Sequence, residues 1–426
     1  MKELLKQYLP ETIINILRYF AHPGLLYERY QIFKQPKVYK RIIKKNKKQI
    51  YKVAFFVTHS SVWKYDYLYY LMQEHERFDP IVVICPIVNY GRENMLMEME
   101  RSYNLFTEKG YNVVCAYDVV SDTYMDIKAK LAPDIIFYTN PYKGLIDRKY
   151  YIDKFLDKFT CYVPYSASIC SEPSQFKLGF YSLLCKFYLE NTLSQQIAKK
   201  EMKNNAWNTQ VVGFPALDAM FNNSIKEDTW RHNQQFKIIW APHHSFDDEC
   251  SVHFSNFLQI SDSMLKIRDK YKKDIQIAFK PHPLLYIKLL NLWGEEKTDD
   301  YFQNWAKGDN SQYEDGEYVD LFKTSDAMIF DSISFIYEYL YTQKPSLFIY
   351  NNNIDEQLND FGKAALKCHQ FAVSVYDIEN FILQVINQEP DPLLNRKKDF
   401  YQKNIQPSNA QTASENILMN LLSELS

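Results

Sequence analysis

Three short polar clusters in the second half of the sequence combine side chains that donate hydrogen bonds, carry positive charge or transfer protons. Each cluster follows an apolar run with the length and composition of a buried strand. Such a set suits a diphosphate, because lysine supplies a point charge and histidine donates to a phosphate oxygen or protonates a leaving group. The clusters are WAPHHS with His243, His244 and Ser245, AFKPHP with Lys280 and His282, and MIFDSIS with Asp331, Ser332 and Ser334.

The third cluster comes just before a segment with a helical pattern. Free backbone N–H groups and the dipole at a helix start attract anions, so we expect Ser332 and Ser334 to lie near a phosphate. Glu338, one turn further on, is expected to accept hydrogen bonds from a ribose. Structural roles remain open beside these, namely a helix cap for Asp331 and Ser334, an exposed helix position for Glu338 and a loop role for either histidine of WAPHHS.

His282 is the histidine whose position is most constrained by its neighbours. Pro281 and Pro283 fix φ on either side and favour an extended conformation before each proline. An imidazole held in this way needs no reorganisation when charge develops on a leaving phosphate. The sequence therefore predicts a catalytic role for His282.

The elements that must position these clusters alternate between strand and helix, which predicts parallel sheets covered by helices. The alternation begins near Tyr51, is interrupted by a polar stretch at 222–235 and restarts at Lys237. Strands are expected at 52–59, 79–88, 111–118, 133–141, 160–168, 209–218, 237–245, 274–283, 326–332 and 345–350, with one long helix at 175–203.

We therefore predict an α/β protein of two doubly wound, Rossmann-like domains with a ligand cleft between them. The expected parts are an N-terminal basic segment, an acceptor domain, a nucleotide-donor domain and C-terminal helices that pack back on the acceptor domain. Their ranges are 1–50, 51–221, 236–390 and 391–426.

Composition excludes several classes of protein. Hydrophobic residues make up 46% and charged residues 24% of the 426 residues, which is typical of a globular protein. The 7 cysteines form no C-x-x-C pair, and the 10 glycines form neither G-x-G-x-x-G nor a Walker A loop. We predict reduced thiols, no essential metal and no cofactor.

Residues 1–48 combine short amphipathic stretches with a block of eight basic and no acidic residues at 34–48. This combination favours contact with an anionic membrane surface, although the segment would also suit a solvated face packed on its own domain. We find no signal peptide and no run of about 18 apolar residues, so the expected location is cytoplasmic and peripheral at the inner face of the membrane. The net charge of −2 and the lack of a recognition motif exclude nucleic acid.

The order WAPHHS, KPHP and D-S-x-S-F-x-x-E-Y-L-Y-x-x-K-P over 237–350 resembles the CDP-glycerol glycerophosphotransferase family, which includes teichoic acid polymerases, primases and related capsule enzymes. The resemblance implies a GT-B-like fold and transfer of glycerol phosphate, or a similar polyol phosphate, from a CDP-linked donor to a hydroxyl of a surface glycan. It equates His282 with the family histidine that engages the donor pyrophosphate, and Ser332 and Ser334 with the serines that follow the family aspartate.

One feature departs from that family. The polymerases carry a W-H-G-T motif whose histidine is regarded as the base, whereas the comparable segment here reads YVPYSASI at 162–169. The nearest replacement is His59 at the end of the first strand, with Ser60 and Lys64 as acceptor-binding neighbours. The alternative is that Tyr165 and Ser166 hold the acceptor and no side chain acts as base.

Two other functions fit parts of the sequence. An inverting GT-B glycosyltransferase that uses a nucleotide sugar would share the fold and the cleft. A non-catalytic scaffold of a capsule assembly complex would bind no nucleotide, and the clustered histidines argue against it.

Overall fold

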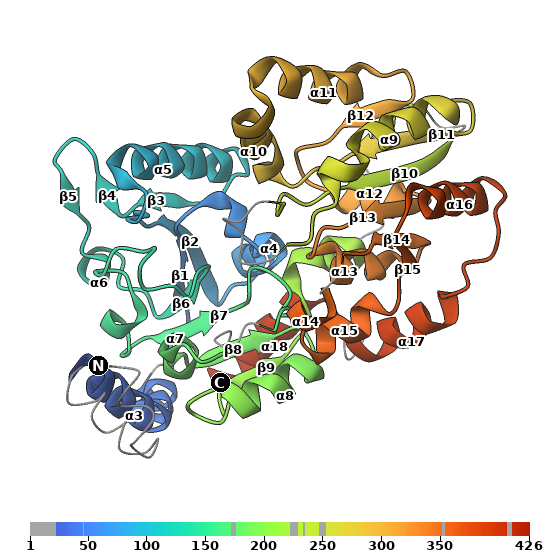
Figure 1. The fold of residues 1–426 in the computed structure, drawn as a ribbon. Helices are drawn as coiled ribbons and strands as arrows, with labels where there is room; N and C mark the ends of the chain where they lie inside the picture. Colours follow the sequence, from blue (N-terminus) through green and yellow to red (C-terminus); the bar gives the residue numbers. More distant parts are fainter. Residues whose placement is uncertain are drawn as a thin grey trace, which may run out of the picture. The chain divides into compact units, whose positions relative to one another are not determined.

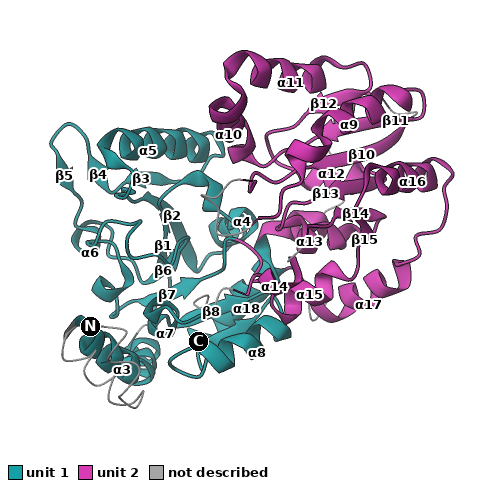
Figure 2. Cartoon of the chain, in the orientation of Figure 1, with its two compact units in different colours: residues 1–165, 173–215, 413–426 teal, residues 166–172, 216–412 magenta. Residues whose placement is uncertain are grey.

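The computed structural model describes residues 23–45, 47–171, 176–221, 229–232, 235–246, 253–351, 354–406 and 411–426. The chain divides into two compact units, which Figure 2 shows in different colours. Unit 1 comprises residues 1–165, 173–215 and 413–426, and unit 2 comprises residues 166–172 and 216–412. The units are therefore interleaved in sequence.

Unit 1 is built on a sheet that has seven strands in the described part of the chain. All neighbouring strands in it pair in parallel, as expected where strands alternate with helices. Across the sheet the order is β3 (Val113–Cys115), β2 (Phe78–Ile84), β1 (Tyr51–Val57), β6 (Ile135–Tyr138), β7 (Phe159–Tyr162), β8 (Lys186–Leu189) and β9 (Thr209–Val211). A separate antiparallel pair consists of β4 (Tyr117–Asp118) and β5 (Thr123–Tyr124).

Helices cover both faces of this sheet (Figure 1). They are α3 (Pro23–Lys45), α4 (Asp66–Glu74), α5 (Gly91–Glu108), α6 (Ile127–Lys130), α7 (Gly179–Leu183), α8 (Thr192–Glu201) and α18 (Ala413–Glu424). Successive residues of β1 point to opposite faces, so Phe55 packs in the layer of α4, α5 and α18, and Phe56 packs in the layer of α7 and α8.

Unit 2 carries a second parallel sheet, of six strands in the described residues. Its order is β12 (Ser311–Tyr313), β11 (Ile275–Phe279), β10 (Phe236–Ala241), β13 (Ala327–Phe330), β14 (Ser346–Ile349) and β15 (Gln370–Ala372). With the first sheet, this confirms the predicted pair of parallel α/β sheets.

The core of unit 2 is centred on Trp240, which is fully buried. Its ring lies 5.0 Å from that of Phe279 and 5.1 Å from that of Trp305. The helices of the unit are α9 (Phe257–Lys270), α10 (Pro283–Trp293), α11 (Glu295–Lys307), α12 (Val319–Thr324), α13 (Phe335–Glu338), α14 (Ile354–Gln357), α15 (Asp360–Leu366), α16 (Val375–Ile386) and α17 (Leu394–Asn404).

The structure corrects three expectations. The long helix predicted at 175–203 is interrupted by β8, which separates α7 from α8. The short strands β12 and β15 were not predicted. Of the C-terminal helices, α18 belongs to unit 1, but α17 belongs to unit 2 and packs against the 3-10 helix η4 (Tyr339–Thr342). Much of the predicted linker at 222–235 lies outside the described residues.

Candidate functional site

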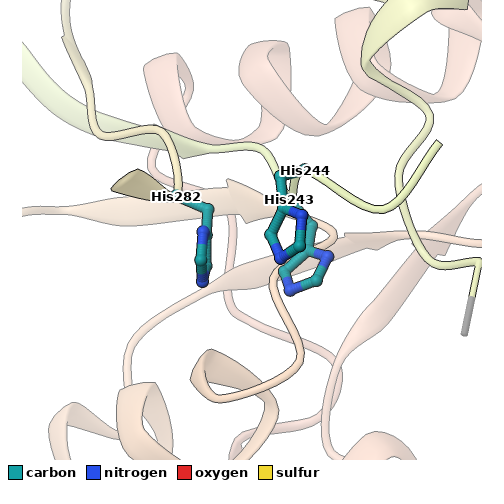
Figure 3. A group of neighbouring side chains, drawn as sticks. All are labelled: His243, His244 and His282. Carbon is teal, nitrogen blue, oxygen red and sulfur yellow. The ribbon is translucent and has the colours of Figure 1, made fainter. Parts of the chain in front are cut away.

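Three imidazoles gather at the carboxyl edge of the second sheet, near the point where its strand order reverses between β10 and β13. Ligands of doubly wound sheets bind at such a point. His243 and His244 follow β10, and His282 follows the adjacent strand β11 (Figure 3). The ring centroid of His282 is 5.0 Å from that of His243 and 4.2 Å from that of His244.

A buried carboxylate fixes the loop that carries two of these histidines. Asp331, directly after β13, is 0% exposed. One carboxylate oxygen accepts the His243 amide at 2.6 Å, and the other accepts the Asn256 amide at 2.6 Å. Burial raises the pKa of Asp331 to about 7. Asp331 therefore positions the loop that carries His243 and His244, and its expected contact with the donor stays a prediction.

The hydrogen bonds of His243 and His282 determine which ring nitrogen carries the proton. Nδ1 of His243 accepts the Ser245 amide at 3.3 Å and lies 2.7 Å from the Ser245 hydroxyl. Nδ1 of His282 accepts the Leu284 amide at 3.1 Å and so caps α10. A neutral imidazole has one N–H and one acceptor nitrogen. Both rings therefore carry the proton on Nε2, where each is a hydrogen-bond donor.

Burial keeps these rings neutral. It lowers the pKa of His282 to about 3, and the neighbouring His244 and Lys280 contribute in the same direction. Burial also holds the pKa of His243 well below its usual value, with contributions from the other two histidines. At neutral pH His243 and His282 consequently present N–H donors without the charge repulsion of imidazolium groups.

The same cluster also has the composition of a metal site, because one ring nitrogen from each histidine lies within 4.8 Å of the others. A histidine that binds a metal offers a lone pair to the ion and donates its other N–H to the protein. His243 and His282 show the opposite arrangement, since Nδ1 of each accepts a backbone N–H. Their arrangement fits an anion better than a cation.

The ammonium of Lys280 contacts other residues of unit 2. Its ammonium donates to the Gly316 carbonyl at 2.8 Å and lies 5.9 Å from the ring centroid of Tyr318. Tyr318 in turn donates to Glu338 at 2.6 Å, and Glu338 is only 4% exposed. Burial lowers the pKa of Lys280, partly offset by Glu314 and other acidic residues of the same loop. The sequence analysis missed Tyr318, although the acidic EDGEY segment after β12 is a visible signal.

The helix expected to attract an anion is short. α13 has four residues, with Ser334 at its N-cap, and the Ser334 side chain makes no capping hydrogen bond. Ser332 is 7% exposed. α13 continues directly into the 3-10 helix η4, so the helical segment spans 335–342. The expected attraction of an anion to its start stays a prediction. The two serines still follow β13 at the same sheet edge as the histidines.

The candidate residues of the first domain lie at the corresponding point of unit 1, where the strand order reverses between β1 and β6. His59 follows β1, and its Nδ1 lies 2.7 Å from the Ser61 hydroxyl. Burial lowers the pKa of His59, partly offset by Glu98. Ser60 and Lys64 are half-buried and lie in and just after the 3-10 helix η1 (Ser60–Val62).

Tyr165 and Ser166 stand at a boundary between the two units. Tyr165 belongs to unit 1, where its hydroxyl lies 3.5 Å from that of Tyr142. Ser166 begins the segment 166–172 that belongs to unit 2. The structure thus brings together the three histidines, Ser245 and Asp331 in unit 2, and assigns His59 and its neighbours to unit 1.

Comparisons with known proteins agree with this architecture. Residues 180–422 match a family described as CDP-Glycerol:Poly(glycerophosphate) glycerophosphotransferase. No protein with a curated description matches the chain.

Solved structures with the same fold share little sequence. A variant of the wall teichoic acid polymerase TagF has a TM-score of 0.54 at 12% identity, covering 97% of both chains. UDP-GlcNAc 2-epimerase from Neisseria meningitidis, bound to UDP-GlcNAc, has a TM-score of 0.56 at 13% identity, covering 87% of this chain and 99% of the other. S. aureus MnaA with UDP has a TM-score of 0.54 at 14% identity, covering 88% and 98%. These similarities show a GT-B-like fold.

Proposed function

We propose that this chain, which belongs to the CDP-glycerol:poly(glycerophosphate) glycerophosphotransferase family, transfers glycerol phosphate from CDP-glycerol to a hydroxyl of a teichoic acid or capsule glycan. The observation that carries the proposal is the pair of Nε2–H groups of His243 and His282 at the point where the sheet of unit 2 reverses its strand order. Neutral donors held by backbone contacts are suited to the oxygens of a diphosphate.

In this reaction the acceptor oxygen attacks the phosphorus that bears the glycerol. A new P–O bond forms, and the P–O bond to CMP breaks with its electron pair leaving on CMP. The Nε2–H groups of His243 and His282 stabilise the charge that develops on the diphosphate oxygens. Around them we place Lys280, His244, Ser245, Ser332 and Ser334 toward the donor, with Glu338 near the ribose.

The proton released by the acceptor hydroxyl passes to His59 in this proposal. The lowered pKa of His59 leaves the imidazole neutral and able to accept a proton at pH 7. Ser60, Lys64, Tyr165 and Ser166 are then the residues that hold the acceptor. If His59→Gln keeps full turnover, the alternative in which Tyr165 and Ser166 hold the acceptor without a base is the correct one.

Release of CMP from CDP-glycerol with a glycan acceptor tests the proposal directly. In His282→Asn the new side chain can still cap α10, since asparagine is a good N-cap residue. We expect an unchanged melting temperature and a kcat about 10²- to 10³-fold lower, the usual loss for one preorganised donor.

The matched control is the exposed His253, whose replacement by Asn should change neither quantity. Normal CMP release by His282→Asn would remove His282 from the site. Consumption of a UDP-sugar in place of CDP-glycerol would instead identify an inverting glycosyltransferase.

We also propose that the chain attaches to the anionic inner face of the cell membrane through residues 1–48, of which 1–22 and 46 lie outside the described residues. Leu26, Tyr30 and Phe33 of α3 are 46%, 51% and 77% exposed and follow one another at helical spacing. The basic residues of 34–48 follow directly. In the described residues no helix is long and apolar enough to span a bilayer, so the attachment would be peripheral.

A further inference from the structure

A basic cavity lies in unit 1, in the segment that follows β6. Its volume is about 290 Å³, and its lining consists of Lys143, Arg148, Tyr151, Asp153 and Lys154. β6 is the strand next to β1 at the point where the strand order reverses, so the segment emerges from the sheet edge where ligands bind in folds of this kind. None of these residues belongs to the site proposed above.

The backbone around the cavity is fixed by the neighbouring strand ends. Ile146 forms an antiparallel bridge with Ile87, and the Asp147 amide donates to the Pro86 carbonyl at 3.3 Å. The Tyr150 hydroxyl donates to the Ala116 carbonyl at 2.6 Å. A cavity held in this way is formed before a ligand arrives, which reduces the entropy cost of binding.

The charge of the lining is unbalanced. Lys143 lies 3.9 Å from Asp153, a loose ion pair. Arg148 and Lys154 are exposed, and within the described residues neither has an ion-pair partner. Tyr151 is 8% exposed, and its ring centroid lies 5.6 Å from the Lys143 ammonium. The cavity therefore combines two unneutralised cations with an aromatic wall, which suits an anion.

Asp153 adds a second requirement. Its Oδ1 is buried and has no hydrogen-bond partner among the residues that the structure describes. The Asp153 side chain as a whole is 30% exposed, so its other oxygen, Oδ2, is the atom that a ligand in the cavity reaches. A simple anion would be repelled by this carboxylate, whereas a hydroxyl of the ligand donates to Oδ2.

We propose that this cavity binds a phosphodiester that carries free hydroxyls, with the phosphate between Arg148 and Lys154 and a hydroxyl on Asp153. A glycerol phosphate unit has this chemistry. It occurs in a poly(glycerol phosphate) acceptor chain and in the headgroup of phosphatidylglycerol. The inference rests on the proposed function only for the origin of the ligand.

Calorimetric titration without any nucleotide donor tests the binding, so the outcome does not depend on turnover. The probes are glycerophosphoglycerol and dimethyl phosphate, two phosphodiesters of equal charge that differ in their hydroxyls. The triple variant Lys143→Gln, Arg148→Gln, Lys154→Gln should bind glycerophosphoglycerol about tenfold or more weakly. The control Lys130→Gln, Lys199→Gln, Lys200→Gln removes three exposed charges of the same unit and should bind as the unchanged chain does.

Asp153→Ala removes both the charge and the hydroxyl acceptor. It should tighten binding of dimethyl phosphate, because a like charge is removed, and should reduce the preference for glycerophosphoglycerol. Equal binding by both triple variants, or an unchanged preference in Asp153→Ala, overturns the proposal.

Vesicles distinguish the two origins of the ligand. If the chain contacts membranes only through the charges of residues 1–48, it binds phosphatidylglycerol and phosphatidylserine vesicles of equal surface charge with equal affinity. The cavity variant is the triple variant Lys143→Gln, Arg148→Gln, Lys154→Gln. If the unchanged chain prefers phosphatidylglycerol vesicles and the cavity variant does not, the ligand is the lipid headgroup. Equal vesicle affinities, together with tighter binding of soluble poly(glycerol phosphate) by the unchanged chain, assign the cavity to the acceptor. If the cavity variant keeps both the preference for phosphatidylglycerol vesicles and the binding of poly(glycerol phosphate), neither ligand occupies the cavity.

Discussion

Asp331 is the residue on which the geometry of the histidine cluster most depends. Its two oxygens hold the amides of His243 and Asn256, which stand on either side of the loop between β10 and α9. The Ser255 hydroxyl adds a bond of 2.6 Å to the His243 carbonyl. Removing one acceptor leaves a buried N–H unpaired, which costs about 1–3 kcal/mol.

Replacing Asp331 by Asn should therefore lower stability in a pH-dependent way. The pKa of about 7 in the folded chain lies above the ordinary value of an unfolded aspartate. Between these values the folded state holds a proton that the unfolded state has lost, so the stability of the unchanged chain falls as pH rises from about 4 to 7. Asn does not titrate, so its stability deficit should be larger near pH 4 than near pH 8.

Urea unfolding at several pH values measures this difference. Asp157, an exposed partner of Lys128, provides the control: Asp157→Asn should change stability by less than about 1 kcal/mol at every pH. A deficit of Asp331→Asn that grows with pH would contradict the argument.

At the scale of the element, α3 exposes apolar side chains beside a basic block. Replacing Leu26, Tyr30 and Phe33 by Ser should weaken binding to anionic vesicles by about tenfold or more, because each buried apolar side chain contributes about 1.5–3 kcal/mol. Sedimentation with vesicles measures the effect, and added salt should weaken the binding of the unchanged chain.

The control uses apolar residues that are at least as exposed but lie elsewhere. Val120, Val373 and Tyr376 are 99%, 78% and 72% exposed, and their replacement by Ser should leave vesicle binding unchanged. If both triple variants lose affinity equally, α3 is not the membrane contact.

The elements that the sequence predicted poorly are those whose local pattern fits two structures. Leu183, Leu184, Phe187 and Tyr188 follow a helical spacing, so 175–203 was predicted as one helix. In the folded chain Phe187 and Tyr188 pair with β9 and pack in opposite apolar layers. A strand of four residues carries too little local signal, and only pairing with neighbouring strands selects it.

At the scale of the whole molecule, nucleotide binding separates an enzyme from a scaffold. CDP-glycerol at about 100 times its Kd should add about 2.7 kcal/mol to the stability of the chain if only the folded state binds. Thermal unfolding with CDP-glycerol, UDP-GlcNAc and no nucleotide measures this. Stabilisation by neither nucleotide would favour the scaffold, whereas stabilisation by UDP-GlcNAc alone would favour the glycosyltransferase.

The two parallel sheets and the sheet edge bearing the histidines were predictable because strand ends are visible in the sequence. His243 and His282 follow continuous apolar runs, so their meeting needs only that β10 and β11 be neighbours. The sequence analysis missed Asn256, which donates to Asp331, and Tyr318, which donates to Glu338. Each comes from a loop whose position is set by the packing of the whole unit and not by its local sequence. No local sequence pattern indicates that the chain returns from unit 2 to unit 1 either.

The interleaving affects how the chain folds during its synthesis. Ile417 and Leu421 of α18 belong to the same apolar layer as Leu68 and Tyr69 of α4, and the Tyr51 hydroxyl donates to the Leu425 carbonyl at 3.0 Å. The ribosome makes this helix roughly 200 residues after the last strand of unit 1, a delay of about 10–40 s at about 5–20 residues per second. During that interval the part of this apolar layer that α18 covers, beside α4, stays open on the nascent chain. The first unit to emerge is therefore the last to be completed, and its open apolar residues favour aggregation until unit 2 has been translated.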